Sequence, residues 1–349
     1  MINFRIVVVT IFIMLGLILL GFFVYWVQGD NINTGGLNLF QKIVSRKLPL
    51  AKSIQKSNLI STPSDFVTLW YTDFDGKRVV GIDRVGNQVW LQRMDASPLP
   101  PSGHATHTEY VTVAPNGNLI VSDGEAMFVQ EIDRKTHALV WQYGKKDIQS
   151  AEDGYLHQPD KSYKLNDNEV LINDGNNRRV IIIDQRINKI VWQYGETLRM
   201  GTKPGMLMAN TNTVPLNGGS QILITDTLAK KVLIVDRATK KIIWEWMKPD
   251  AGWIQHVWPT DTDTFVMEDR NKNEIFEVDK QGKILWTLST LENGRKISHP
   301  TDVIKLGNGN VLIAISGGVL EVTPLTGKIV NEYKKLGYVT TIAIDQNVP

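Results

Sequence analysis

Hydrophobic and polar residues alternate along most of the chain, in short runs separated by turn residues. The run Val111-Thr112-Val113 is one example, and the apolar run Leu119-Ile120-Val121 follows it after an Asn-Gly turn. A period of two is typical of half-buried β-strands, and no long helical period interrupts it after residue 63. The pattern predicts an all-β domain over residues 63–349.

A strand–turn–strand unit recurs along this domain. Its first strand ends in an aspartate and its second strand carries a tryptophan, as in the segment from Asp236 to Trp244. The tryptophans stand at positions 90, 141, 192, 244 and 286, and Asn331 takes this place in a sixth copy. A period of about 40–50 residues with four strands is the signature of a propeller blade. The sequence therefore predicts a six-bladed β-propeller with the tryptophans between the blades.

The two ends of the domain complement each other. The first repeat has no clear innermost strand, whereas the chain continues beyond the sixth repeat through residues 338–345. That last segment resembles Tyr110-Val111-Thr112-Val113-Ala114, which we assign as the innermost strand of the second repeat. We expect the C-terminal strand to complete the first blade, because this closes the ring and leaves no free strand edge.

Residues 6–27 are 22 consecutive uncharged residues. At 1.5 Å per residue, a helix of this length crosses a hydrocarbon core of about 30 Å. The segment ends in bulky residues that include Tyr25 and Trp26, without the small-residue cleavage site of a signal peptide. We expect an uncleaved transmembrane signal anchor, which makes the protein a single-pass protein of the cell membrane.

The charges that flank this segment bear on its orientation. Arg5 favours a cytoplasmic location for residues 1–5, whereas the five basic residues between positions 42 and 56 oppose it. Long domains are translocated largely regardless of charge, so we expect the propeller on the extracytoplasmic side. Residues 28–62 form a juxtamembrane connector, which either lies on anionic lipid as a basic helix or packs as a stalk against the domain.

Charge and cysteine content exclude several classes of protein. The net charge is +2, but residues 1–60 hold six basic side chains and one acidic side chain, which leaves −3 for the remaining 289 residues. A nucleic-acid-binding domain would be strongly basic, so we predict no nucleic-acid partner. The chain has no cysteine, which excludes disulfides, thiolate metal sites and a thiol nucleophile.

Chain direction divides the loops between the two faces of the ring. The connections from the outermost strand of one blade to the innermost strand of the next are long. They share one face with the turns between the second and third strands, and we call this the long-loop face. Its long connections are residues 93–106, 144–156, 195–207, 247–255 and 289–298. Long loops on a rigid scaffold commonly carry function.

Candidate ligand-binding residues gather on this face. Histidines recur where innermost strands begin, and three of them precede the first asparagine of the next turn by nine residues. Aspartates end the second strands, with basic residues and tryptophans nearby. The candidates are His107, His157, His256, His299, Asp174, Asp226, Asp269, Arg270, Trp253 and Trp258.

The repeat resembles those of known propeller families. A degraded form of Asp-x-x-Thr-Gly-x-x-x-Trp occurs at residues 133–141 and 236–244 and is similar to the repeat of PQQ-type propellers. The inner hairpin has a histidine, an Asn-Gly-Asn-like turn and an apolar strand that ends in aspartate, and it resembles NHL-type and bacterial arylsulfotransferase propellers. The resemblance covers about residues 65–349. It implies the fold but leaves the function open, because these families include enzymes, receptors and assembly factors.

Three interpretations of the histidines and aspartates are open. They could be architectural and bonded to neighbouring backbone, they could hold a ligand or a divalent metal, or they could be catalytic. The resemblance to arylsulfotransferases implies sulfuryl transfer with His256 or His299 as the nucleophile and Arg178 or Arg270 as the anion clamp. PQQ enzymes resemble larger, eight-bladed rings that often place adjacent cysteines against the cofactor, so we predict no bound PQQ or other cofactor.

These observations converge on a membrane-anchored, extracytoplasmic propeller. We expect it to contact the lipid bilayer through residues 6–27 and to bind a protein partner or a small anionic ligand on its long-loop face. The alternative is an arylsulfotransferase-type enzyme that uses the channel histidines for sulfuryl transfer.

Overall fold

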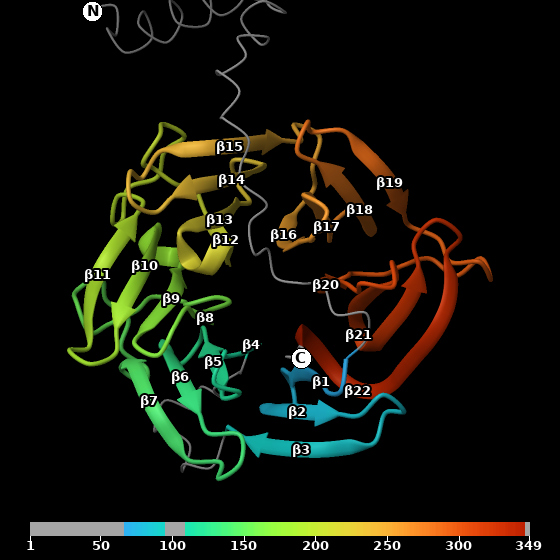
Figure 1. The fold of residues 1–349 in the computed structure, drawn as a ribbon, viewed down its shortest axis with the longest axis horizontal. Coiled ribbons are helices and arrows are strands. Elements are labelled where there is room, and N and C mark those ends of the chain that lie inside the picture. The colour runs from blue at the N-terminus through green and yellow to red at the C-terminus, as the bar shows by residue number, and fades with distance from the viewer. Residues whose placement is uncertain (1–65, 95–108, 346–349) are drawn as a thin grey trace, which may run out of the picture. The chain divides into compact units, whose positions relative to one another are not determined.

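The computed structural model describes residues 66–94 and 109–345, and these residues form a ring of β-sheets (Figure 1). Within this part of the chain, no helix is long and apolar enough to cross a membrane. The predicted anchor at residues 6–27, the connector at residues 28–62 and His107 lie outside the described residues.

Four sheets have four antiparallel strands each, and every one is built from strands that are consecutive in the sequence. The strands are β4 (Tyr110–Val113), β5 (Leu119–Asp123), β6 (Phe128–Ile132) and β7 (Leu139–Gly144); β8 (Tyr163–Lys164), β9 (Glu169–Asp174), β10 (Arg179–Asp184) and β11 (Lys189–Tyr194); β12 (Asn210–Leu216), β13 (Gln221–Asp226), β14 (Lys231–Asp236) and β15 (Ile242–Met247); and β16 (Ile254–Pro259), β17 (Thr264–Asp269), β18 (Glu274–Asp279) and β19 (Ile284–Leu288).

In each of these sheets the first strand lies nearest the axis of the ring and the last lies at the rim (Figure 1). The core lies between neighbouring sheets, where for example Leu171 of β9 and Ile222 of β13 belong to one cluster of buried side chains. Middle strands are therefore buried along their whole length, as β10 is, whereas the rim strand β7 is mostly exposed or half-buried. This explains why the middle strands read as continuous apolar runs.

The fifth sheet has six strands, so the structure has five sheets, and the prediction of six blades is wrong. Its strands, in spatial order, are β20 (Asp302–Lys305), β21 (Val311–Thr323), β22 (Lys328–Ile344), β1 (Leu69–Asp73), β2 (Arg78–Ile82) and β3 (Gln88–Arg93). The physical reason is the length of β21 and β22, which have 13 and 17 residues and run on where the other repeats have loops. The sixth and first repeats are thereby merged into one sheet.

The pairing of the C-terminal strand with the first repeat is confirmed. The end of β22 pairs with β1 in an antiparallel register, with Ile344 opposite Leu69 and Ile342 opposite Tyr71. At its other end β22 pairs with β21, where Lys328 lies opposite Thr323. One strand therefore belongs to both the last and the first repeat, and it closes the ring.

The aspartate and tryptophan of the repeat hold neighbouring repeats together. Asp236 ends β14, and its Oδ1 accepts the backbone N–H of Thr239 at 2.8 Å, which shapes the turn into β15. The indole Nε1 of Trp192 donates to the carbonyl oxygen of Arg237 in this turn at 2.8 Å, although Trp192 belongs to the preceding repeat. The repeating motif therefore forms a hydrogen-bonded link between neighbouring repeats at the rim of the ring.

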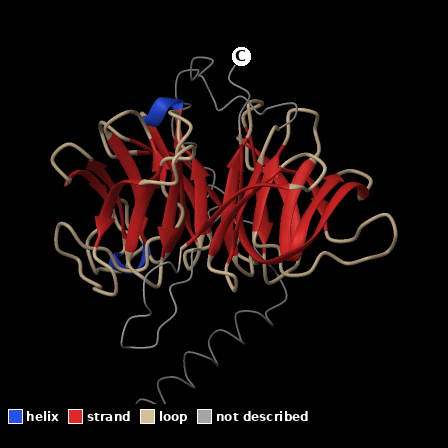
Figure 2. Cartoon of the chain, turned by 90° about the horizontal axis from the view of Figure 1, so that it is seen from below, coloured by secondary structure: helices blue, strands red, loops and turns tan. Residues whose placement is uncertain are grey.

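The strands run from one face of the ring to the other, and the loops lie on both faces (Figure 2). Two short 3-10 helices lie on opposite faces, η1 (Gly175–Asn177) after β9 and η2 (Asn217–Gly219) before β13. On the long-loop face four of the long connections are bonded to the turn of their own repeat, as where Leu198 N–H donates to the carbonyl oxygen of Asn177 at 2.9 Å. These bonds order the loops on which the candidate residues lie.

Candidate functional site

The aspartates that end the second strands are architectural. Oδ1 of Asp174 accepts the backbone N–H of His157 at 2.8 Å, and its Oδ2 accepts Nε of Arg179 at 2.7 Å. Asp226 accepts the N–H of Ala209 at 2.8 Å. Burial raises the pKa values of Asp174 and Asp226, although these hydrogen bonds oppose the rise. The carboxylate oxygens of Asp174 and Asp226 thus already accept hydrogen bonds from the protein itself.

Asp269 has the same role in the next repeat. Its carboxylate accepts the backbone N–H of Gly252 at 2.7 Å and that of Trp253 at 2.8 Å. Trp253 is half-buried, and its carbonyl oxygen accepts the N–H of Arg270 at 2.9 Å. Trp258 belongs to the hydrophobic core and is only 9% exposed. Trp258 is therefore a core residue, and Trp253 connects two loops.

His157 and His299 do not occupy equivalent positions. The Asp160 N–H bonds to the Asn173 carbonyl oxygen at 2.9 Å, and the Thr301 N–H bonds to the Ala314 carbonyl oxygen at 3.0 Å. This correspondence matches His299 to Gln158, one residue beyond His157. His299 and Gln158 also share a positive φ, of 45° and 55°. The expected equivalence of His157 and His299 is corrected by this one-residue offset.

His256 lies on the axis of the ring rather than at a mouth. It is 2% exposed, and its Nδ1 lies 3.4 Å from Oε1 of Glu268 and 3.9 Å from Oδ1 of Asp302. The ring of Tyr110 packs against it edge-on, with 5.8 Å between the ring centroids. Two adjacent carboxylates would repel a sulfuryl anion, so this environment does not fit a nucleophile of the arylsulfotransferase kind.

A buried ion pair that the sequence did not suggest closes the axis. Nζ of Lys161 lies 2.7 Å from Oδ2 of Asp302, and both side chains are almost completely buried. The same carboxylate accepts the Thr341 hydroxyl at 2.7 Å and the Ile342 N–H at 3.0 Å. Burial opposes the charged forms, but the mutual attraction lowers the pKa of Asp302 and raises that of Lys161. Lys161 and Asp302 follow the equivalent residues Asp160 and Thr301, so both are inner-strand positions.

The remaining candidates are dispersed. His157 is half-buried beside β9, and Arg178 is half-buried with a positive φ of 60° just after η1. Among the residues that the structure describes, no three His, Asp or Glu side chains are grouped so that they could hold a metal ion. The arrangement therefore offers no observation in favour of a divalent metal at the predicted ring.

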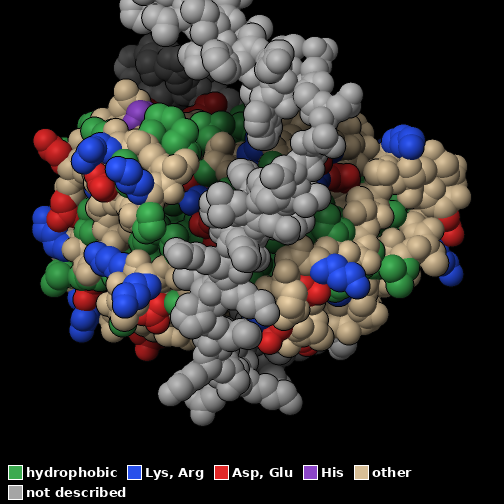
Figure 3. Space-filling view, turned by 90° about the horizontal axis from the view of Figure 1, so that it is seen from above, with side chains coloured by type: hydrophobic (Ala, Val, Ile, Leu, Met, Phe, Trp, Pro, Cys, Tyr) green, Lys and Arg blue, Asp and Glu red, His purple; other side chains and the backbone are tan. Residues whose placement is uncertain are grey.

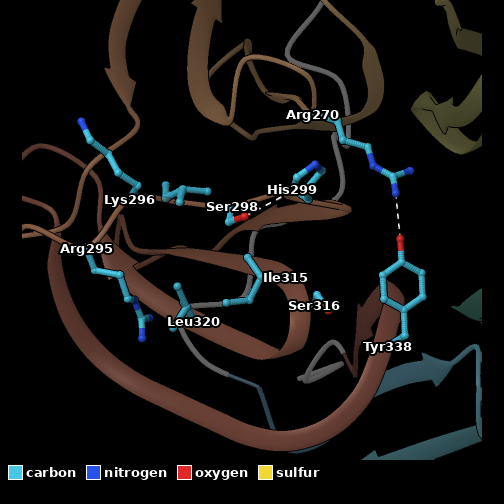
Figure 4. A pocket seen from close by; sticks show the side chains of 10 residues that line it. Arg270, Arg295, Lys296, Ser298, His299, Ile315, Ser316, Leu320 and Tyr338 are labelled. Carbon is cyan, nitrogen blue, oxygen red and sulfur yellow. Dashed lines mark hydrogen bonds between the residues drawn. The ribbon is translucent and has the colours of Figure 1, made fainter.

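Arg270 and His299 are the two predicted residues that the structure brings to one pocket. This cationic pocket has a volume of about 570 Å³ and opens on the long-loop face. Figure 4 shows Arg295 and Lys296 on one side, Arg270 and Tyr338 on the other, and His299 and Ser298 between them. Nη2 of Arg270 donates to the Tyr338 hydroxyl at 2.7 Å. The sequence predicted neither Arg295, Lys296 nor Tyr338 as site residues.

A smaller pocket of about 200 Å³ shares Arg270 and Tyr338 with the cationic pocket. Glu109, Tyr110 and Gln255 also line it, and Nε2 of Gln255 donates to the Tyr110 hydroxyl at 3.0 Å. Burial raises the pKa of Glu109 to about 8, and the charges of Asp123 and Glu125 add to the rise. A protonatable acid thus lies next to the cationic pocket.

The exposed charges are mixed in sign on the side of the molecule shown in Figure 3, where basic and acidic side chains are interspersed with apolar ones. The absence of a nucleic-acid partner stays a prediction.

Comparison with known proteins identifies the family. The sequence matches the family described as outer membrane protein assembly factor BamB over residues 75–245 and 207–337. The chain belongs to this family of PQQ-like propellers. The PQQ-like repeat predicted from the sequence is therefore confirmed.

Solved structures show the same fold at low identity. A protein of unknown function from Bacteroides caccae has a TM-score of 0.60 and 12% identity, over 80% of this chain and 98% of that chain. A chain of a nidogen/laminin complex has a TM-score of 0.55 and 11% identity, over 79% of this chain and 97% of that chain. The Cps50 (Swd1) β-propeller domain of Myceliophteria thermophila has a TM-score of 0.52 and 14% identity, over 80% of this chain and 86% of that chain. No curated protein matches the sequence.

Proposed function

We propose that this BamB-family protein is a membrane-anchored, non-catalytic binding module that docks a protein partner on its long-loop face. The observation that carries the proposal is a group of exposed apolar side chains, here called the apolar arc, on the loops and one strand end of three successive repeats. Its members are between 48% and 62% exposed: Ile148, Leu198, Met200, Leu228 and Met247. Exposed apolar side chains gathered on functional loops are typical of protein contact sites.

The loops of the apolar arc are held in place by backbone hydrogen bonds. The Asp147 N–H donates to the Ala126 carbonyl oxygen at 3.0 Å, and the Lys248 N–H donates to the Lys230 carbonyl oxygen at 3.1 Å. Between neighbouring repeats, Nδ2 of Asn177 donates to the carbonyl oxygen of Ser150 at 2.8 Å. A surface ordered before binding loses little conformational entropy when a partner docks, which favours affinity.

The family supports a protein as the partner. Its description names an assembly factor for outer membrane proteins, a role that involves contact with other proteins. The uncharged segment at residues 6–27 would hold the propeller beside a bilayer on the extracytoplasmic side. The enzymatic alternative has no such support, because His256 lies beside carboxylates and the other histidines that the structure describes are dispersed.

Site-specific photo-crosslinking tests the docking face. A photoreactive phenylalanine analogue at position 198 of the full chain, expressed in its native membrane, is expected to give one discrete adduct. The matched control is position 187, because Ile187 is 61% exposed but lies in the turn between β10 and β11 on the opposite face. The double change Met200→Glu and Leu228→Glu should remove the adduct at 198. Equal crosslinking at 198 and 187, or none at 198, would contradict the proposal.

Membrane attachment has a separate test. Deletion of residues 1–30 is expected to move the protein from the membrane pellet to the soluble fraction, because it removes the whole uncharged segment. Protease added outside the intact inner membrane should digest the propeller of the full chain. Protection from that protease would contradict the extracytoplasmic placement.

A further inference from the structure

The sixth repeat lacks a carboxylate that the other five have. The second strands β1, β5, β9, β13 and β17 end in Asp73, Asp123, Asp174, Asp226 and Asp269. The hydrogen bonds of Asp160 to Asn173 and of Thr301 to Ala314 are equivalent, so the residue that corresponds to Asp174 is Ile315. An apolar side chain therefore stands where each other repeat has a buried acid.

The cationic pocket opens at this position. Ile315 lines it together with Arg270, Arg295 and Lys296, and the lining residues that the structure describes include no Asp or Glu. Over the described ranges, neither Arg270 nor Lys296 has a carboxylate within 4.0 Å, while Arg295 is paired with Glu332 at 2.6 Å. Arg270 therefore lines the pocket without a carboxylate partner among the described residues, while Nζ of the exposed Lys296 donates to the Thr290 hydroxyl at 2.8 Å.

Arg295 provides a second, independent indication of an absent anion. Its Nη1 donates to Glu332, but its Nη2 is buried and has no hydrogen-bond acceptor among the residues described here. A buried donor of a charged group without an acceptor costs free energy, and a bound anion would supply that acceptor.

The rest of the lining defines the body of the ligand. Ile297, Ile315 and Leu320 are apolar, and Ser298 and Ser316 add hydroxyl groups. The volume of about 570 Å³ lies in the range of small-molecule sites, about 300–1,000 Å³. A ligand that fits both the basic and the apolar side chains of the lining carries one anionic group on an apolar body.

We propose that the cationic pocket binds a small organic anion, a phosphate or carboxylate on an aromatic or aliphatic body, whose anionic group takes the place of the missing aspartate. Arg270 and Nη2 of Arg295 contact the anionic group, and Ile297 and Leu320 contact the apolar body. The site is independent of the apolar arc, which lies on other repeats, so either proposal can fail without the other.

Isothermal titration calorimetry of the full chain in detergent tests the ligand class with phenyl phosphate, inorganic phosphate and phenol. Phenyl phosphate is expected to bind about tenfold or more tightly than inorganic phosphate, and phenol is expected not to bind. Equal affinity for phenyl phosphate and inorganic phosphate would overturn the proposed apolar part of the site. A further titration with dihexanoyl phosphatidate distinguishes a lipid headgroup from a soluble ligand: whichever of this lipid and phenyl phosphate binds more tightly identifies the source, and both must exceed inorganic phosphate.

Restoring the missing carboxylate is the sharpest variant. Ile315→Asp should abolish phenyl phosphate binding, because its carboxylate would occupy the anion position. Ile315→Asn, which has nearly the same size and no charge, should retain affinity within about threefold. Unchanged binding by a folded Ile315→Asp variant would overturn the proposal.

Variants of the cations test the site even if Ile315→Asp fails to fold. Arg270→Gln should weaken phenyl phosphate binding about tenfold or more, since it removes a charge-assisted contact. Lys296→Gln should weaken it less, because the Lys296 side chain points away from the cavity (Figure 4). Arg199→Gln is the matched control, because Arg199 is an exposed cation of the same face that is paired with Glu196 at 2.6 Å. Equal losses in all three variants would show only diffuse attraction and would overturn the site.

Discussion

The side-chain amide of Asn331 donates a hydrogen bond to the backbone carbonyl of Arg84, with 3.3 Å between Nδ2 and the oxygen. Nε1 of Trp90 makes the equivalent bond to the Arg134 carbonyl oxygen at 2.8 Å, and that of Trp244 makes it to the Lys280 carbonyl oxygen at 2.9 Å. The sixth repeat has lost the indole ring but has kept the bond to the next repeat. The bond, and not only the apolar ring, is therefore part of what the repeated position provides.

Removal of one hydrogen-bonded link between repeats should lower the stability of the propeller measurably. Trp192→Phe retains an aromatic ring but removes the Nε1 donor to Arg237, and the carbonyl of Arg237 loses its partner. We expect the free energy of unfolding to fall by about 1 kcal/mol, the usual net contribution of one such hydrogen bond. Urea unfolding followed by far-ultraviolet circular dichroism measures this difference.

The control for the Trp192 variant is Trp253→Phe. Trp253 is half-buried, and its contacts with Asp269 and Arg270 are made by its backbone. The substitution should therefore change the urea midpoint less than Trp192→Phe does. If the two variants unfold alike, the indole donor contributes nothing beyond its ring.

The ion pair on the axis predicts a larger effect. Lys161→Met leaves the carboxylate of Asp302 buried beside Glu268 without its cation. We expect a loss of about 3–5 kcal/mol in the free energy of unfolding, because one partner of a buried ion pair is then uncompensated. Equilibrium unfolding in urea, compared with the wild type, gives the value.

A double variant separates the buried charge from lost packing. Lys161→Met with Asp302→Asn removes both charges, while the amide oxygen of the new side chain can still accept hydrogen bonds from Thr341 and Ile342. The double variant should be more stable than Lys161→Met alone. A double variant that is less stable than the single one would show that burial of an unpaired charge is not the cause.

The sequence predicts the β-propeller because its local strand and turn patterns agree with the contacts that the strands make between repeats. The repeated Asp indicates a turn, as at Asp236. Trp90, Trp192 and Trp244 indicate a bond to the next repeat, and they recur at a regular spacing along the chain. It fails at residues 316–318, where β21 continues through a segment that its serine and two glycines favour as a loop. Pairing with β22, at Ser316 opposite Tyr338, decides that segment, and local sequence does not encode such a partner.

The candidate site was predicted in part for a similar reason. Topology places Arg270 and His299 on the long-loop face, and both line the cationic pocket. The equivalence of His157 and His299 was wrong, because counting from the asparagine misses a one-residue difference in the turns. Lys161 and Asp302 are 141 residues apart, and nothing local indicates that they meet on the axis. The sequence signal that marks this pocket is the absence of aspartate at Ile315.

Acid should destabilise the ring partly through Glu131. Burial raises the pKa of this carboxyl, but hydrogen bonds from Lys164, Gln185 and two asparagines outweigh burial and lower it to about 2. Since the folded pKa lies below the ordinary 4.5, its contribution to stability is present above pH 4.5 and is lost as the pH falls toward 2. Glu131→Gln should be less stable at pH 7 and should lose less stability between pH 5 and 2 than the wild type. Thermal unfolding at a series of pH values measures both, and parallel curves for the two proteins would contradict it.

Alkali should act through Glu109 with the opposite sign. Its pKa is raised from 4.5 to about 8, first by burial and then by the nearby carboxylates Asp123 and Glu125. A raised folded pKa means that the contribution to stability is complete below pH 4.5 and is lost as the pH rises through about 8. Glu109→Gln, which stays uncharged, should therefore unfold at a higher temperature than the wild type at pH 9, and the difference should shrink as the pH falls to 6. The exposed Glu152, changed to Gln, is the matched control and should leave the pH profile of the wild type unaltered. If the wild type and Glu109→Gln keep a constant difference from pH 6 to 9, Glu109 does not titrate in this interval.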